Sequence, residues 1–223
     1  MMGKLKLIVF DMAGTTVDDV IGGTPLVLKS YDDAFRKYGV IVPMNVLNDQ
    51  RGKDKKTVIK EFGGLHADKI YAFFVDALLK NVSRVGEIEG TRDVFSHLHE
   101  LGVYVAVGSG FPLVVSKAII NHLEWEKNGL IDYWTCSEVV GKSRPNPAMI
   151  YAMMKHLNVS DPSRVMKVDD TFKGIEEGVR AGAITIGVLT GTHSREKLQS
   201  ANPTTILESV KDLPVYLKTK NYI

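Results

Sequence analysis

Short apolar runs alternate with amphipathic segments along most of this chain of 223 residues. Six runs have the length and composition of strands: Leu5–Phe10, Val103–Gly108, Tyr133–Cys136, Arg164–Val168, Ile184–Leu189 and Thr204–Ile206. Five segments between or after them have helical spacing: Gly90–Leu101, Pro112–Leu123, Pro147–Leu157, Phe172–Ala181 and Ser194–Ala201. This alternation predicts an α/β fold, a three-layer Rossmann-like parallel sheet with helices on both faces.

A long stretch after the first apolar run breaks the alternation. It contains three segments with helical spacing and no convincing strand between them: Leu26–Tyr38, Lys55–Phe62 and Ala67–Asn81. An insert that directly follows the first strand would lie over the carboxyl ends of the strands, where open α/β sheets bind ligands. We therefore predict a Rossmann-like catalytic core of residues 1–17 and 86–223, with residues 18–85 forming an inserted helical cap.

The composition narrows the range of partners. A net charge of +2 gives no reason to expect nucleic acid or an anionic membrane as the partner. The four consecutive apolar residues Leu7–Phe10 are too few for a signal peptide or a membrane span. The single cysteine, Cys136, has no partner for an internal disulfide and is expected to be a buried strand residue. We expect a soluble, cytoplasmic protein that acts on a small molecule.

The first candidate for chemistry is Asp11, which ends the first apolar run. A carboxylate at this place should project from the edge of the sheet into the crevice above it. Taken alone, an Asp followed by a Gly-Thr pair is about as often a turn former or a helix N-cap. The later motifs decide between these interpretations.

The second motif is Ser109-Gly110, which stands at the end of a predicted strand and just before a predicted helix. A hydroxyl and free backbone N–H groups at a helix start can hold phosphoryl oxygens. The structural alternative is a serine that only caps the helix.

The third motif supplies a cation. Arg144 stands directly before Pro145-Asn146-Pro147, and Lys142 is close enough to compete with it. A fixed cation here would neutralise a nucleophile and a phosphoryl group during attack. The structural alternative is a surface loop that ends at two prolines.

The fourth motif is a pair of acids, Asp169 and Asp170, directly after an apolar strand. Paired carboxylates suit a hard divalent cation, because Mg²⁺ prefers oxygen ligands.

In this order, the four motifs resemble those of the haloacid dehalogenase-like phosphotransferases. The family's phosphatases usually carry a second acid two residues after the first, where this chain has Ala13 followed by Gly-Thr-Thr-Val-Asp. In this respect the chain is similar to the phosphonoacetaldehyde hydrolase, or phosphonatase-like, branch. The resemblance covers nearly the whole chain and implies a hydrolase in which Asp11 attacks phosphorus and forms an aspartyl-phosphate.

The resemblance also implies roles for individual residues. The family's third motif has Lys or Arg directly before Pro-x-Pro, which matches Arg144 rather than Lys142. Mg²⁺ would bind Asp11, the Ala13 backbone carbonyl and Asp170, with Asp169 as an outer or alternative ligand. The expected catalytic residues are Asp11, Ser109, Arg144 and Lys55, and the expected substrate-binding residues are Thr15, Gly110, Arg51 and Lys142.

Lys55 enters through the chemistry of the phosphonatase-like branch. Breaking a P–C bond expels a carbanion, so a cap lysine of that branch forms a Schiff base with the aldehyde and an enamine leaves instead. That lysine lies three residues after a glycine, which matches Lys55 after Gly52. A free lysine titrates near 10.4, so Lys55 would need desolvation or crowding by like charge. The alternative is a solvated, lysine-rich helix start.

At three positions this chain differs from the pattern of the phosphonatase-like branch or of the wider family, so the resemblance does not determine the substrate. Arg51 stands where the branch has Met, Val58 where it has His, and Gly174 where many family members have another acid. Arg51 could meet an anionic group on a different substrate. The alternatives are therefore a phosphate monoester phosphatase, or a catalytically weak relative that binds a phosphorylated ligand. A homodimer through the cap is plausible from the resemblance only.

Overall fold

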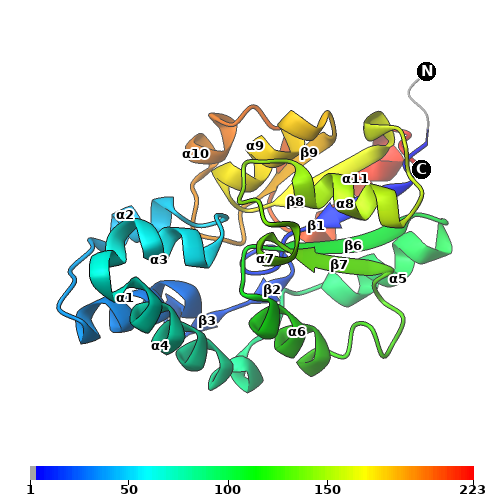
Figure 1. The fold of residues 1–223 in the computed structure, drawn as a ribbon. Helices are drawn as coiled ribbons and strands as arrows, with labels where there is room; N and C mark the ends of the chain where they lie inside the picture. The colour runs from blue at the N-terminus through cyan, green and yellow to red at the C-terminus, as the bar shows by residue number, and fades with distance from the viewer. Residues whose placement is uncertain (1–3) are drawn as a thin grey trace.

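The computed structural model describes residues 4–223, so the first three residues of the predicted core segment 1–17 lie outside it. Its central sheet has six parallel strands in the order β10-β9-β8-β1-β6-β7 (Figure 1). The strands are β1 (Leu7–Phe10), β6 (Tyr104–Ser109), β7 (Tyr133–Cys136), β8 (Val165–Asp169), β9 (Ile184–Val188) and β10 (Thr205–Leu207). The predicted α/β sheet is confirmed, and the single cysteine, Cys136, is buried in β7.

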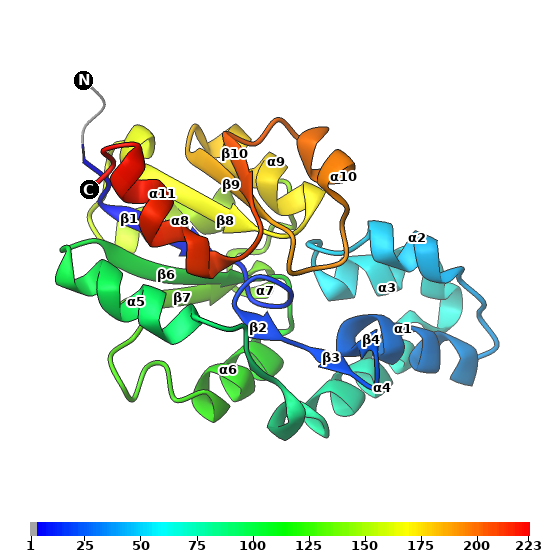
Figure 2. The ribbon, with the colours of Figure 1, turned by 180° about the vertical axis from the view of Figure 1, so that it is seen from behind.

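Alternate residues of β1 face opposite sides of this sheet. Ile8 and Phe10 belong to one buried cluster, whereas Leu7 and Val9 belong to another. Helices cover both sides, with α8 in front of the sheet in Figure 1 and α5 and α11 in front of it in Figure 2. The core helices are α5 (Thr91–Glu100), α6 (Leu113–His122), α7 (Ser137–Val140), α8 (Ala148–His156), α9 (Phe172–Ala181), α10 (Arg195–Gln199) and α11 (Leu213–Thr219), with the 3₁₀ turns η3 (Pro162–Arg164) and η4 (Val210–Asp212). Helices on both faces suit these strands, because most of their residues are apolar.

The stretch between β1 and α5 forms a group of helices beyond the carboxyl ends of the strands (Figure 1). Its helices are α1 (Leu26–Lys37), α2 (Met44–Asp49), α3 (Lys55–Gly63) and α4 (Ala67–Leu79), with the 3₁₀ turns η1 (Gly64–His66) and η2 (Val82–Arg84). The rings of Tyr31 on α1 and Phe74 on α4 stack with centroids 4.6 Å apart. This contact joins the first and last helices of the group around a buried aromatic centre.

Two short elements of this stretch were not predicted. Helix α2 buries only Leu47, so its six residues carry no apolar stripe for periodicity to detect. The passage at Gly22-Gly23 is the turn of a hairpin between β3 (Val20–Ile21) and β4 (Thr24–Pro25). Both glycines have positive φ angles, 61° and 79°, which such a turn favours.

The two chain segments that connect the helical group to the sheet pair with each other. Strand β2 (Val17–Asp18) runs antiparallel to β5 (Gly86–Glu87). The predicted division into a core and a cap at residues 17/18 and 85/86 falls in this ribbon, and we keep that division as a proposal. In residues 4–223, none of the helices has both the length and the apolar character that crossing a bilayer requires.

Candidate active site

Asp11 and Arg144 form a buried ion pair at the carboxyl edge of the sheet. Asp11 directly follows β1, and its backbone N–H donates to the Val168 carbonyl of the neighbouring strand at 3.0 Å. The Arg144 Nη1 atom donates to Asp11 Oδ1 at 2.6 Å. Asp11 is 6% exposed and Arg144 is 2% exposed, so water screens this pair very little.

Arg144 is held from two further directions. Its Nε donates to Glu177 Oε2 at 2.9 Å, and its Nη2 donates to the Gly108 carbonyl at 2.9 Å. Burial alone would lower the pKa of Arg144, but Asp11, Glu177 and Asp169 raise it above its ordinary value. The guanidinium is therefore a fixed positive charge aimed at Asp11.

Three buried acids gather where β1 and β8 end. Asp11, Asp169 and Asp170 each offer one carboxylate oxygen, and these atoms lie within 4.8 Å of one another. Such a group of oxygens is what a divalent cation requires, but the three acids differ in what already surrounds them.

Asp169 is already satisfied by the protein. Its Oδ1 accepts hydrogen bonds from the Thr171 backbone N–H at 2.9 Å and the Thr171 hydroxyl at 2.6 Å. Its Oδ2 lies 2.8 Å from the Lys167 Nζ, as an ion pair rather than a well-aligned hydrogen bond. Burial alone would raise the pKa of Asp169, but Lys167 and Arg144 outweigh it and hold the pKa below its usual range.

Asp170 keeps one oxygen free. Its Oδ1 accepts from the Thr15 hydroxyl at 2.9 Å, whereas its buried Oδ2 has no hydrogen-bond partner among the described residues. Burial raises the pKa of this carboxyl to about 7, against the opposing effect of Arg51. An orphaned, desolvated carboxylate oxygen close to Asp11 fits a divalent cation.

Two glycines make room for this orphaned oxygen. A Cβ atom at Gly14 would lie 2.5 Å from Asp170 Oδ2, and one at Gly191 would lie 1.8 Å from it. Gly14 also has a φ of 87°, a conformation that favours glycine. The backbone therefore closes around the carboxylate of Asp170 from two sides.

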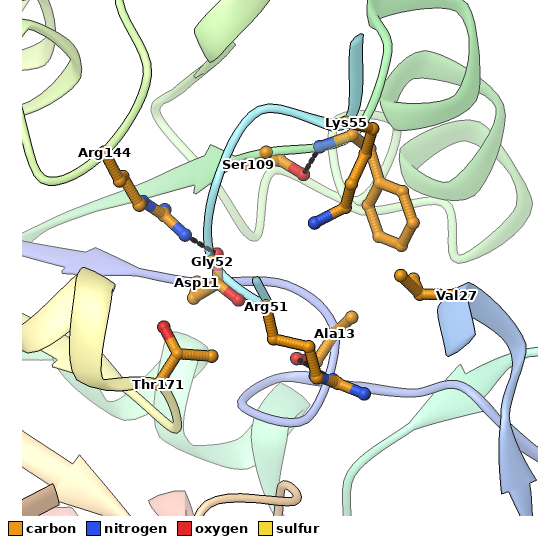
Figure 3. Close-up of a pocket in the computed structure, with 11 residues that line it drawn as sticks. Asp11, Ala13, Val27, Arg51, Gly52, Lys55, Ser109, Arg144 and Thr171 are labelled. Atoms are coloured by element: carbon orange, nitrogen blue, oxygen red, sulfur yellow. Dashed lines mark hydrogen bonds and ion pairs between the residues drawn. The ribbon is translucent and has the colours of Figure 1, made fainter. Parts of the chain in front are cut away.

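The loop of residues 50–54, between α2 and α3, rests directly on the core. A Cβ atom at Gly52, whose φ is 85°, would lie 2.5 Å from the Thr171 hydroxyl oxygen. A Cβ atom at Gly110 would lie 2.5 Å from the Lys53 carbonyl oxygen. The backbone N–H of Lys55 donates to the Gly110 carbonyl at 3.2 Å. These close approaches place Arg51 and Lys55 beside Asp11 (Figure 3).

Lys55 is buried although it is a lysine. It is 5% exposed, its Nζ donates to the Lys53 carbonyl at 3.1 Å, and the Nζ lies 5.6 Å from the centroid of the Phe111 ring. Burial lowers its pKa from 10.5 to about 8, helped by the charges of Arg51 and Arg144 and opposed by Asp11. An appreciable fraction of Lys55 is therefore a neutral amine near neutral pH.

Arg51, in the loop of residues 50–54, is the second buried cation on this side of the pocket, and it is 3% exposed. Its Nη2 donates to the Ala13 carbonyl at 3.1 Å and lies 3.8 Å from both Asp19 Oδ1 and Asp170 Oδ2. Its Nη1 is buried and has no hydrogen-bond partner among the described residues.

These groups surround a small, partly open pocket. It is lined by Asp11, Ala13, Val27, Arg51, Gly52, Lys55, Ser109, Gly110, Phe111, Arg144 and Thr171 (Figure 3). The Ser109 hydroxyl accepts from the Phe111 backbone N–H at 3.0 Å, so it faces the pocket in a fixed orientation. The pocket therefore combines a carboxylate, three cationic side chains and an apolar wall of Val27 and Phe111.

Most of the residues singled out in the sequence meet here. Thr15, Asp169 and Asp170 are buried just behind the pocket rather than among its lining residues. Lys142 is exposed and does not line the pocket, which leaves Arg144 as the cation on Asp11.

Sequence reasoning missed the residues that support this site. Lys167 is a cation among the apolar residues Val165, Met166 and Val168 of β8, and that interruption was a signal for a buried partner. Glu177 lies one turn after Gly174 on the buried side of α9, and a buried acid on that face was a weaker signal. Asp19 and Val27 carried no recognisable signal, because the pairing of distant segments places them at the site.

Comparison with known sequences gives two kinds of match. A family model described as haloacid dehalogenase-like hydrolase matches residues 8–188. The phosphonoacetaldehyde hydrolase of Bordetella pertussis is 29% identical to this chain, with 96% of this chain and 91% of that protein covered. The phosphonoacetaldehyde hydrolase of Lactiplantibacillus plantarum is 24% identical, with 85% of this chain and 77% of that protein covered.

Solved structures share the fold at lower identity. A phosphonoacetaldehyde hydrolase-like protein from Oleispira antarctica aligns with a TM-score of 0.85 and 23% identity, covering 99% of this chain and 94% of that one. A predicted phosphoglycolate phosphatase from Haemophilus somnus aligns with a TM-score of 0.80 and 16% identity, covering 97% and 99%. At these identities the similarity establishes the fold but does not identify the substrate, which depends on the residues of the site.

Proposed function

Since this chain belongs to the haloacid dehalogenase-like hydrolase family, we propose that it is a Mg²⁺-dependent hydrolase of a small phosphonate, acting through an aspartyl-phosphate at Asp11. The relatives named phosphonoacetaldehyde hydrolase, at 24–29% identity, support a phosphonate with an aldehyde group. We propose phosphonoacetaldehyde, or a close analogue, as the substrate, and the cytoplasm as the location.

The nucleophile is the Asp11 carboxylate, which Arg144 holds at 2.6 Å. Arg144 cannot lose its proton at working pH, so it offsets negative charge on the nucleophile and on the phosphoryl oxygens throughout the reaction. When bound by Asp11, the Ala13 carbonyl and Asp170, Mg²⁺ supplies further positive charge for the phosphoryl group. The Ser109 hydroxyl and the Gly110 backbone line the side of the pocket where phosphoryl oxygens would lie.

Lys55 allows the carbon atom of the P–C bond to leave. Its neutral amine adds to the aldehyde. The adduct takes up one proton from the solvent and expels water, which leaves a protonated imine. Asp11 then attacks phosphorus, and the electrons of the P–C bond pass into the imine to give an enamine. The enamine takes a proton from water at its terminal carbon. Hydrolysis of the imine releases acetaldehyde and Lys55, and a second water releases phosphate and Asp11.

The observation that carries this proposal is the burial of Lys55 in the same pocket as Asp11, with its pKa lowered to about 8. Burying a cation that pairs with no carboxylate costs free energy of folding. A catalytic role for the uncharged amine would explain why Lys55 is buried here. The Ala13 position fits as well, because an enamine leaving group needs no acid beside the nucleophile.

A phosphate monoester phosphatase is the second candidate. It is favoured by Arg51, a buried cation at the pocket, and by Val58, which is fully buried where the phosphonatase branch has a histidine. A catalytically weak relative that binds a phosphorylated ligand is the third. A homodimer through the cap stays a prediction for either enzyme.

The test combines product analysis with chemical trapping. Purified protein with Mg²⁺ and phosphonoacetaldehyde should release phosphate and acetaldehyde, and borohydride should fix a secondary amine on the peptide that carries Lys55. Lys55→Arg should lose both, whereas Lys56→Arg, an exposed neighbour on the same helix, should keep both. Full release of acetaldehyde by Lys55→Arg would overturn the phosphonatase proposal. Hydrolysis of 4-nitrophenyl phosphate without any trapped adduct would favour the phosphatase.

A further inference from the structure

The buried acids of the site do not all have their own cation. Arg144 pairs with Asp11, and Lys167 pairs with Asp169. Asp170 has no cation closer than 3.8 Å among the described residues, and the group at that distance is the guanidinium of Arg51, which belongs to the loop of residues 50–54. Arg51 is therefore the counter-charge of Asp170.

Arg51 also hydrogen-bonds another atom that the proposed function gives to the divalent cation. Its Nη2 donates to the Ala13 carbonyl at 3.1 Å, while Asp170 Oδ2 is 3.8 Å away and otherwise without a partner. Two of the proposed metal ligands therefore already face a positive charge from the protein. Because like charges repel strongly where water is excluded, that charge opposes a metal ion on the same ligands.

A second carboxylate is available to Arg51. Asp19 Oδ1 lies 3.8 Å from the same Nη2 atom, and Arg51 is the sole cation within 4.0 Å of Asp19 in residues 4–223. Arg51 lines both the active-site pocket and a neighbouring open cavity, which Asp19 also lines. The guanidinium therefore has both a partner and space on the side away from Asp11.

We propose that Arg51 competes with the divalent cation for the Ala13 carbonyl and Asp170, and that Asp19 accepts Arg51 when the cation binds. The metal affinity is then set by a cap residue, and metal binding is coupled to the loop of residues 50–54, which directly precedes Lys55. This inference rests on one part of the proposed function, namely that the divalent cation binds at Asp11, the Ala13 carbonyl and Asp170.

The test measures binding of Mn²⁺ without substrate, from the electron paramagnetic resonance signal of the free ion. Arg51→Met removes the competing charge and should tighten Mn²⁺ binding about tenfold. Asp19→Asn removes the alternative partner and should weaken binding about threefold. Lys53→Met, a partly exposed cation of the same loop, should change the dissociation constant by less than about twofold.

The double variant Arg51→Met/Asp19→Asn makes the test specific. If Asp19 acts through Arg51, Asp19→Asn should have no effect once Arg51→Met is also present. Unchanged or weaker Mn²⁺ binding by Arg51→Met, or an equal effect of Asp19→Asn in both backgrounds, would overturn the proposal. Circular dichroism checks that each variant is folded, and Arg51→Gln replaces Arg51→Met if that variant is not.

A reference variant separates this inference from the proposed function. Asp170→Asn should weaken Mn²⁺ binding more than tenfold if Asp170 is a metal ligand. If it does not, the metal site of the proposed function is misplaced. If it does and Arg51→Met fails to tighten binding, the site stands and the competition by Arg51 is wrong.

Discussion

The carboxylate of Asp169 occupies the space that a side chain at Gly174 would need. A Cβ atom at Gly174 would lie 1.9 Å from both Cγ and Oδ2 of Asp169. Gly174 lies within α9 and its φ is not positive, so its backbone conformation does not require glycine. A glycine inside a helix costs about 1 kcal/mol relative to alanine, and the space for Asp169 explains why it is tolerated here.

Replacing Gly174 with a larger residue should therefore destabilise the folded protein. Gly174→Ala should lower the free energy of unfolding by about 3–5 kcal/mol, because the methyl group displaces Asp169 and leaves the buried Lys167 without its acid. That loss corresponds to a fall in the thermal midpoint of about 6–20 °C, measured by calorimetry. Gly86→Ala is the control, since nothing lies within 4 Å of a Cβ atom there. An unchanged midpoint for Gly174→Ala would contradict this explanation.

Lys55 should reduce stability in a pH-dependent way. In the folded protein its pKa is lowered from 10.5 to about 8, so between these values the unfolded chain binds more protons and stability rises with pH. Below pH 8 the cost is constant, at about 3 kcal/mol. Lys55→Met should therefore be more stable than the parent by about 2–3 kcal/mol at pH 7, and this gain should vanish above pH 10.5. Denaturant melts at pH 7 and pH 10.5 measure both values, and an equal difference at the two pH values would contradict the titration of Lys55.

The same pKa predicts the acid side of the rate profile. If the neutral amine of Lys55 starts the reaction, kcat/KM for phosphonoacetaldehyde should rise with pH and level off above about pH 8. Arg51 is one of the charges that lower this pKa, so Arg51→Met should move the rise to higher pH. Rates from pH 6 to pH 9.5 at saturating Mg²⁺ give the profile. A rise that stays at the same pH in Arg51→Met would show that another group sets it.

Asp11 should be indispensable for phosphate release. Asp11→Asn keeps the shape of the side chain but removes the nucleophile, so kcat should fall at least about a thousandfold. It also removes the charge that Arg144 faces at 2.6 Å, so the variant must first be shown to melt cooperatively. Asp18→Asn, an exposed acid in β2, is the matched control and should keep the parent rate. Retention of more than about a tenth of the activity by Asp11→Asn would argue against an aspartyl-phosphate.

The sequence predicted the sheet well because its strands are buried on both faces and stand out as apolar runs. It missed α2 and the β3–β4 hairpin, since a six-residue helix with one buried side chain and strands of two residues have no periodicity to detect. Asp11, Asp169 and Asp170 could be picked out because each follows an apolar strand.

The sequence could not predict how the surroundings of those three acids differ. Asp169 and Asp170 are neighbours in the chain, yet Asp169 has Lys167 at 2.8 Å and Asp170 has no cation closer than 3.8 Å in residues 4–223. That difference depends on Lys167 and on Gly191, whose closeness to the acids follows from the packing of α9 and the loop after β9. Likewise, the burial of Lys55 depends on Gly110, a residue 55 positions further along the chain that lets the loop approach.

The antiparallel pair of β2 and β5 has a mechanical consequence. Both chain crossings between the sheet and the helical group run through this narrow ribbon, so the group is hinged along one line rather than tethered at two separate points. The close approaches of Gly52 to Thr171 and of Gly110 to Lys53 hold the loop of residues 50–54 against the sheet domain. We therefore expect substrate to enter when the helices rotate about this ribbon, a motion that would move Arg51 and Lys55 together.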